Sequence, residues 1–241
     1  MKVVRYADRE DLRARRFEEL TKPTFPEYMN QSEAADLYWG RLYTDFADFQ
    51  VALVNDDDDL LAEAHALSLP WDGTLEDLPS GWEDGFVRGM TSEQPHTALM
   101  AIAISVAPDQ QGRKLSSRMI RTFTDNARTA RLANGVIAPV RPTWKERYPL
   151  IQIERYAEWR RADGSHFDPW LRTHELVGGE IVAPAPWSMT IRGSADEWEE
   201  WTGMPFPEDG TYVFPGGLAP VKFVDGVGTH VEPNVWVHHP V

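Results

Sequence analysis

A basic turn before a predicted helix is the segment of the chain best suited to binding an anion. Residues 110–116 read Gln-Gln-Gly-Arg-Lys-Leu-Ser. A helix N-terminus presents unpaired N–H groups and a partial positive charge, and a turn directly before it folds those donors around a phosphate. Arg113 and Lys114 add two cationic side chains. The sequence holds neither the G-x-G-x-x-G fingerprint nor the G-x-x-x-x-G-K-[ST] loop, which excludes NAD and ATP sites built on those motifs.

Two ionisable residues share an otherwise apolar predicted strand. Glu63 and His65 are two positions apart within 60–69, so they lie on the same face of that strand. Two such groups more often form a structural pair than a catalytic one, but a pair also makes a reasonable proton relay. Glu63 and His65 are therefore candidates for the base that removes a proton from a substrate.

Histidines near the C-terminus do not make a convincing metal site. His230, His238 and His239 have no carboxylate at ligand spacing, and the chain ends directly after them. We expect no bound metal. The sequence has no cysteine, which excludes disulfides, thiolate metal sites and cysteine nucleophiles.

An apolar strand and an amphipathic helix must position the basic turn. Residues 97–106 are nearly apolar on both faces, as is typical of a strand in the middle of a covered sheet. From about 112 to 131, Leu115, Met119 and Phe123 recur on one stripe, which predicts a helix that packs on that sheet.

The remaining pattern alternates helices and strands. We expect a long functional loop at 70–95, rich in Gly, Pro and acidic residues, and a first helix that begins at Asp8 as N-cap and is stopped by Pro23 and Pro26. The other predicted elements are strands at 3–6, 49–54, 60–69, 135–140, 180–192, 212–223 and 231–237, and helices at 32–46, 153–161, 169–177 and 194–201.

Charge is distributed unevenly along the 241 residues. The formal net charge is -14, with 24 Lys+Arg against 38 Asp+Glu, and this argues against a generally basic nucleic-acid binder. Residues 45–93 are strongly acidic, whereas 111–131 carry a net positive charge. No segment has the length and hydropathy of a membrane span, and the N-terminus lacks the apolar core of a signal peptide. We therefore expect a cytoplasmic protein with no membrane partner.

The basic turn resembles motif A of the GNAT superfamily of acyl-CoA-dependent N-acyltransferases. In its pattern, Arg/Gln-x-x-Gly-x-Gly/Ala, Gln111 matches the first position, Lys114 stands at the central glycine and Ser116 replaces the final small residue. The resemblance implies that the turn holds the pyrophosphate of coenzyme A, and that the preceding strand binds the pantetheine arm. The implied cofactor-binding residues are Ile104, Ser105, Val106, Gln111, Gly112, Arg113, Lys114, Leu115 and Ser116.

The resemblance also implies a fold and a reaction. We expect an α/β fold, with a GNAT-like, mixed, mostly antiparallel sheet, helices on both faces, and a strand-rich C-terminal elaboration. The chain would form one domain over 1–241, with its core at about 1–192 and the elaboration at about 193–241. It would transfer an acyl group, most simply acetyl from acetyl-CoA, to the amine of a small molecule or peptide by direct attack. A non-catalytic acyl-CoA sensor and an interaction module built on the Trp-rich C-terminal region are the alternatives, and a homodimer is possible.

The family's usual proton donor has no exact counterpart. Many members place a tyrosine in the helix before the penultimate strand, in a pattern like Tyr-x-x-x-Gly-Phe, and His174 stands where that tyrosine would be. His174 is either a proton donor to the leaving thiolate or a helical histidine without a role. Tyr148 and Tyr156 are the fallback candidates. The acidic loop from Asp72 to Asp84 is a candidate to attract a cationic amine.

Overall fold

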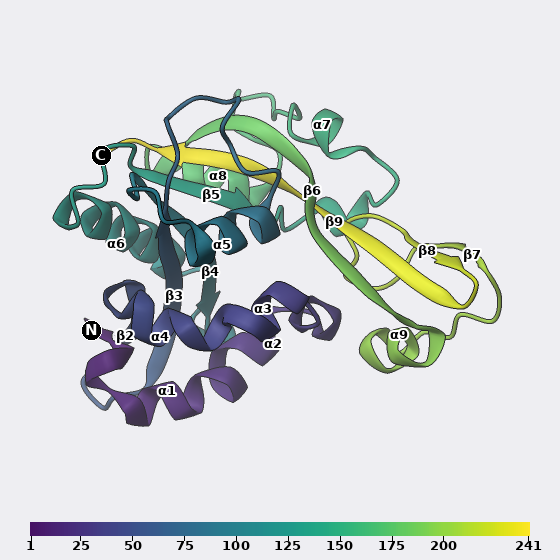
Figure 1. Ribbon diagram of the computed structural model, residues 1–241, viewed down its shortest axis with the longest axis horizontal. Coiled ribbons are helices and arrows are strands. Elements are labelled where there is room, and N and C mark those ends of the chain that lie inside the picture. Colours follow the sequence, from purple (N-terminus) through teal and green to yellow (C-terminus); the bar gives the residue numbers. More distant parts are fainter.

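A nine-stranded mixed sheet organises the molecule. The computed structural model describes all residues from 1 to 241, and it orders the strands β1-β2-β3-β4-β5-β9-β8-β7, with β6 paired to β9 off this path (Figure 1). All neighbours are antiparallel except β4 and β5. The predicted fold class is therefore confirmed. The strands are β1 (Lys2–Arg5), β2 (Gln50–Val54), β3 (Leu60–Leu69), β4 (Ala98–Val106), β5 (Val136–Val140), β6 (Glu180–Ser194), β7 (Gly210–Tyr212), β8 (Val221–Val224) and β9 (Val227–His239).

Nine α-helices connect and cover these strands. They are α1 (Glu10–Arg16), α2 (Lys22–Thr24), α3 (Glu33–Tyr38), α4 (Leu42–Asp45), α5 (Trp82–Thr91), α6 (Leu115–Thr129), α7 (Ile153–Tyr156), α8 (Pro169–Leu176) and α9 (Ala195–Thr202). The prediction of Asp8 as the first N-cap is wrong, because Asp8 lies in a 3-10 turn and its carboxylate accepts from Arg5 at 2.9 Å. A π-helical turn, Phe17–Thr21, joins α1 to α2, so the helical path continues through Pro23.

The two faces of the sheet carry separate hydrophobic cores. On one face, Leu115, Met119 and Phe123 of α6 pack against Leu53, Leu99 and their neighbours. On the other, α3 and α5 pack against the far end of β3 and the start of β4. Side chains that alternate across a strand supply both cores. The predicted helix stripe of the 112–131 segment is thus confirmed, and α6 is held firmly enough to aim the turn before it.

The C-terminal elaboration is a long arm. Strands β6 and β9 extend beyond strands β1 to β5, and α9, β7 and β8 gather at the far end of the arm (Figure 1). The arm has its own core, which includes Trp198, Phe206 and Phe214. The end of β9 returns to the central sheet, where it pairs with β5. The single strand predicted at 212–223 is wrong, because two short strands, β7 and β8, occupy its ends.

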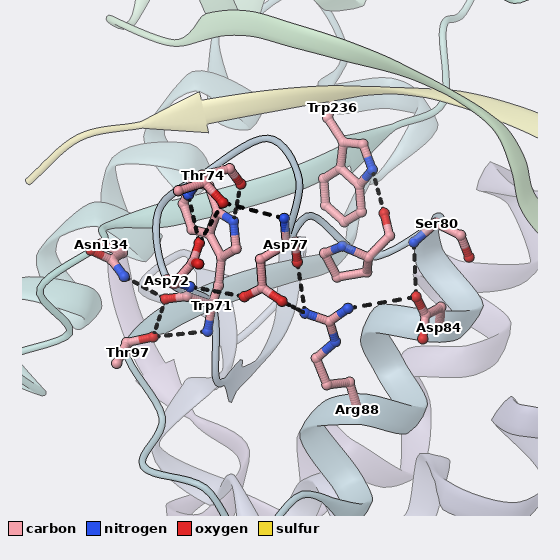
Figure 2. A network of polar contacts seen from close by, with 11 residues as sticks. Trp71, Asp72, Thr74, Asp77, Ser80, Asp84, Arg88, Thr97, Asn134 and Trp236 are labelled. Atoms are coloured by element: carbon pink, nitrogen blue, oxygen red, sulfur yellow. Dashed lines mark hydrogen bonds and ion pairs between the residues drawn. The ribbon is translucent and has the colours of Figure 1, made fainter.

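The acidic loop before α5 stabilises itself. Asp72 accepts from the backbone and hydroxyl of Thr74, and Asp77 accepts from the backbone of Asp72 and from Arg88 (Figure 2). Arg88 also lies 3.8 Å from Asp84. These carboxylates are committed to closing the loop onto α5, and none of them lines the large cavity described below. The carboxylates of this loop are therefore not placed to draw a cationic substrate into that cavity.

No helix in the structure combines the length and the apolar character that a bilayer crossing requires.

Candidate active site

A cavity opens where β4 and β5 separate. These parallel strands are paired only at Leu99–Val136 and Met100–Ile137. Beyond these pairs the strands diverge, and a cavity of about 470 Å³ is lined by residues 101–105 of β4 on one side and 138–141 on the other. Its volume falls in the range of small-molecule sites.

The open edge of β4 presents unpaired backbone groups. Ala107 donates its N–H to the carbonyl of Leu61 on β3 at 3.0 Å. Because successive strand residues direct their backbone groups to opposite edges, Ser105 faces β3 whereas Ile104 and Val106 face the open side. The predicted backbone contacts of Ile104 and Val106 suit this geometry. The prediction for the Ser105 backbone does not, although its hydroxyl is buried, lines the cavity and has no hydrogen-bond partner.

A bulge in β4 lies directly beside the opening. The register with β3 shifts between His65 and Ala66, which leaves Ile102 as the extra residue of β4. Bulges re-aim the groups beside them and are common next to active sites. The indole of Trp82 donates to the Ile102 carbonyl at 3.1 Å and also lines the cavity. The sequence contains no signal for this bulge.

The basic turn follows the open edge and leads into α6. Gly112 has a φ of 76° and Lys114 a φ of 62°, both in the left-handed region. Gln111, Gly112, Arg113 and Lys114 are exposed, Ser116 is half-buried, and Leu115 is buried in the core beneath. Lys114 is the N-cap residue but its side chain makes no capping bond. A lysine at this position costs about 1–2 kcal/mol relative to glycine.

His174 lies in the cavity wall and forms a pair with another histidine. Its Nδ1 lies 2.9 Å from Nε2 of His239, and its Nε2 has no hydrogen-bond partner. Burial and the neighbouring His239 hold the pKa of His174 well below its usual value. Burial and His238 lower the pKa of His239 to about 4. Both imidazoles are therefore neutral at pH 7, and one proton lies between them.

The unpaired nitrogens indicate which histidine donates in this pair. Nδ1 of His239 is buried without a partner. Either tautomer of the pair leaves one buried N–H without a protein partner, at His239 Nδ1 or at His174 Nε2. An orphaned buried N–H is rare in proteins, and only His174 lines the cavity, where a ligand can accept from it. This favours the tautomer in which His239 Nδ1 is bare and its Nε2–H donates to His174. In that state His174 carries its proton on Nε2. It can therefore donate a hydrogen bond to a ligand in the cavity while it stays uncharged.

The histidine pair also predicts an acid-sensitive fold. The pKa of His239 is lower in the folded protein than in the unfolded chain, so its contribution to stability is complete above about pH 6.5 and is lost as the pH falls toward 4. Between pH 7 and pH 5 this single group should cost about 2 kcal/mol of unfolding free energy. Urea unfolding at both pH values measures the drop in unfolding free energy from pH 7 to pH 5. In His239→Gln this drop should be smaller than in the wild-type protein by about 2 kcal/mol. An identical pH dependence in the variant would contradict the assignment.

Glu63 and His65 lie behind the cavity rather than in it. Both side chains are fully buried. The Glu63 carboxylate accepts from Arg16 at 2.6 and 2.9 Å, from Tyr6 at 2.9 Å and from Thr21 at 2.9 Å. Burial opposes ionisation, but His65 and Arg16 outweigh it and keep the pKa of Glu63 below its usual value. A saturated, ionised carboxylate outside the cavity cannot reach a substrate proton, so the structure does not support the predicted catalytic role of this pair.

Tyr148 is also placed away from the cavity. Its ring packs against Tyr156, Trp159 and Phe167 in an aromatic cluster beside α7. Tyr156, the other fallback, donates its hydroxyl to Asp168 at 2.9 Å. Neither residue lines the cavity. Of the predicted catalytic side chains, only His174 does.

Sequence reasoning missed a polar group at the other side of the cavity. We define the polar wall as Asn30, Arg141, Glu232 and Asn234, all of which line the cavity. Arg141 follows β5, and the register of β5 with β9 brings it next to Asn234. The residues come from three segments separated by about a hundred positions each, and no short motif connects them. Only the pairing of β5 with β9 could have related Arg141 to Glu232 and Asn234, and it says nothing about Asn30.

One curated relative resembles most of the chain. It is the arginine N-acetyltransferase avaD of Aspergillus versicolor, which is 32% identical over an alignment 249 positions long, gaps included, that covers 90% of this chain and 85% of the relative. No protein-family model matches the sequence.

Solved structures share the fold at lower identity. The loading GNATL domain of CurA from Lyngbya majuscula superposes with a TM-score of 0.65 at 15% identity, over 99% of this chain and 96% of that domain. The GphF GNAT-like decarboxylase, solved in complex with isobutyryl-CoA, gives a TM-score of 0.57 at 16% identity over 99% of both chains. Other proteins thus share the overall fold in which the strands of this sheet and the turn before α6 lie.

Proposed function

Because the chain belongs to the GNAT superfamily and is an N-acetyltransferase, we propose that its donor is acetyl-CoA and that its acceptor is the amine of a small molecule. The observation that carries this proposal is the open edge of β4. An extended ligand can add to such an edge through main-chain hydrogen bonds, as a further strand would. The unpaired groups of Ile104 and Val106 are suited to the amides of a pantetheine arm.

The turn before α6 would hold the phosphates of this donor. Residues 111–116 bring backbone N–H groups to the start of a 15-residue helix, and Arg113 and Lys114 stand exposed beside them. Helix N-termini bind phosphate through their free N–H groups and their dipole. The turn and the open edge follow one another along the chain, so one elongated ligand can occupy both.

His174 is the side chain that we propose to act on the reacting group. Attack of a neutral amine on the thioester forms the amide and expels coenzyme A as a thiolate, which takes up the proton that the amine loses. A hydrogen bond to the sulfur stabilises the charge that develops there. His174 Nε2–H is buried in the cavity wall without a protein partner and can supply this bond. Since its pKa is lowered, His174 would act as a neutral hydrogen-bond donor rather than as an imidazolium.

The acceptor would enter beside the polar wall. The curated relative is an arginine N-acetyltransferase, which makes free arginine the first acceptor to test. Of the two carboxylates that line the cavity, Glu232 is paired with Arg141 and Asp36 makes no ion pair, so Asp36 is the one suited to a cationic side chain.

Donor binding can be measured without knowing the acceptor. Acetyl-CoA at one hundred times its Kd should stabilise the protein by about 2.7 kcal/mol, which raises Tm by about 5–10 °C for a chain of this size. The double variant Arg113→Glu/Lys114→Glu should lose this shift, because two phosphate-facing cations become anions. Differential scanning fluorimetry gives both values.

A matched variant controls for net charge in this experiment. Arg121→Glu/Arg128→Glu makes the same charge change farther along α6, on exposed residues, and should keep the shift. If millimolar acetyl-CoA left the Tm of the wild-type protein unchanged, the donor assignment would be wrong. Thiol release with arginine as the acceptor then tests the transfer itself.

A further inference from the structure

The polar wall holds one arginine in a fixed position with a free nitrogen. Arg141 donates from Nε to Glu232 at 2.5 Å, and from Nη2 to the Tyr28 hydroxyl at 3.0 Å and the Gly216 carbonyl at 2.5 Å. Its Nη1 makes no hydrogen bond in the structure. The guanidinium is thus locked on one side by protein groups, and its remaining nitrogen is available in a residue that lines the cavity.

Two asparagines add a free donor and a free acceptor. Nδ2 of Asn30 and Oδ1 of Asn234 are both buried and have no hydrogen-bond partner. Asn234 is oriented by its own Nδ2, which donates to the Pro139 carbonyl at 2.7 Å, so Oδ1 is the end left for a ligand. Buried polar atoms are nearly always paired. The chain has eight unpaired ones, and four belong to residues of the cavity: Asn30, Ser105, His174 and Asn234.

Charge at the polar wall is balanced. Burial opposes ionisation of Glu232, but Arg141 and a hydrogen bond from His230 at 2.6 Å outweigh it and lower its pKa. The wall therefore presents one cation and one anion, together with one donor amide, that of Asn30, and one acceptor amide, that of Asn234. Glu232 and Asn234 are two positions apart on β9, so they lie on one face of that strand.

We propose that the polar wall binds the α-amino and α-carboxylate groups of a free amino acid. The carboxylate accepts from Nη1 of Arg141 and Nδ2 of Asn30, and the amine donates to Oδ1 of Asn234 beside Glu232. A zwitterionic head group satisfies every free polar atom of the wall and keeps its charge balanced, whereas a simple amine leaves Arg141 and Asn30 unpaired. This inference rests on the proposed function, and it narrows the acceptor from amines in general to amino acids.

The test compares acceptors that differ only in the carboxylate. Arginine and agmatine form one pair, and phenylalanine and phenethylamine form another. We expect kcat/KM for an amino acid of at least one pair to exceed that of its decarboxylated partner by about a hundredfold, through two hydrogen bonds to a charged group. In Asn30→Ala, the ratio between the two should fall about tenfold through KM. Asn30 makes no side-chain bond to protein through Nδ2, so this change leaves the fold intact.

Asn126→Ala is the matched control. Asn126 is half-buried and also has an unpaired Nδ2, but it lies on α6 away from the cavity, so its replacement should leave the ratio as it is. Equal kcat/KM values within both pairs, or an Asn30→Ala variant with the wild-type ratio, would overturn the proposal.

A binding measurement separates failure of this inference from failure of the proposed function. Calorimetry with each acceptor, in the absence and presence of coenzyme A, reports on the wall alone. Tighter binding of the amino acid than of its amine supports the wall even if no acetyl group is transferred. Equal binding, or none, overturns it even if acetyl-CoA binds and transfer occurs.

Discussion

Replacing Glu63 with alanine should destabilise the folded protein by about 3–5 kcal/mol, because it leaves Arg16 buried without its partner. Glu63 is fully buried and accepts two hydrogen bonds from Arg16, one from Tyr6 and one from Thr21. Removing this carboxylate leaves the donor groups of Arg16, Tyr6 and Thr21 without that acceptor. Urea denaturation at pH 7 measures the loss.

A surface pair provides the contrast. Glu18 lies 2.9 Å from Lys22, but both side chains are more than half exposed, and such pairs contribute about 0–1 kcal/mol. Glu18→Ala should therefore be nearly neutral. A Glu63→Ala variant that kept its unfolding free energy within about 1 kcal/mol of wild type and lost turnover alone would contradict this structural role.

Replacing His174 with alanine should lower kcat by about 10²–10³, the loss usually seen when one preorganised donor to a developing anion is removed. Its Nε2 is unpaired in the cavity, and its Nδ1 is held by His239. KM for acetyl-CoA should change little, since the open edge and the basic turn would supply most of the donor's contacts. Steady-state kinetics with saturating acceptor gives both constants.

The conservative variant decides how His174 acts. A glutamine amide places an N–H near the position of Nε2 but cannot give up a proton, so His174→Gln should recover most of the activity if the residue is a neutral hydrogen-bond donor. A glutamine variant as inactive as the alanine variant would contradict this and favour proton transfer. His96→Ala replaces a half-buried histidine outside the cavity and should retain wild-type kcat.

The central part of the fold could be predicted because pattern and structure agree there. The apolar run at 97–106 and the helical stripe that follows it become β4 and α6 within a few residues. The helix predicted at 32–46 is only partly confirmed. It begins as expected, with Ser32 accepting from the Ala35 N–H, but it breaks into α3, a 3-10 turn and α4 around Gly40, where low helix propensity weakens the pattern.

Only the part of the candidate site whose residues are adjacent in the sequence could be predicted. The basic turn is local, so its spacing was visible in the sequence. The divergence of β4 from β5 begins after Met100, where the pairing of the two strands ends. The apolar pattern of β4 is the same before and after that residue, so the sequence does not reveal the divergence. Arg141 and Asn234 come together through the register of β5 and β9. Glu63 is held behind the cavity by its ion pair with Arg16, which lies on α1, 47 positions away in the sequence. Such contacts carry no periodicity.

The divergence of β4 and β5 also bears on aggregation. An unpaired strand edge usually invites pairing with another chain, and proteins protect such edges with charges, bulges or covering segments. Here the free edge of β4 lies inside the sheet, flanked by β5 on the open side and by a bulge at its start. A second protein would have to insert a strand between β4 and β5, whereas a narrow linear molecule can enter the space between them. The recess thus offers main-chain hydrogen bonds to a small ligand while withholding them from neighbouring proteins.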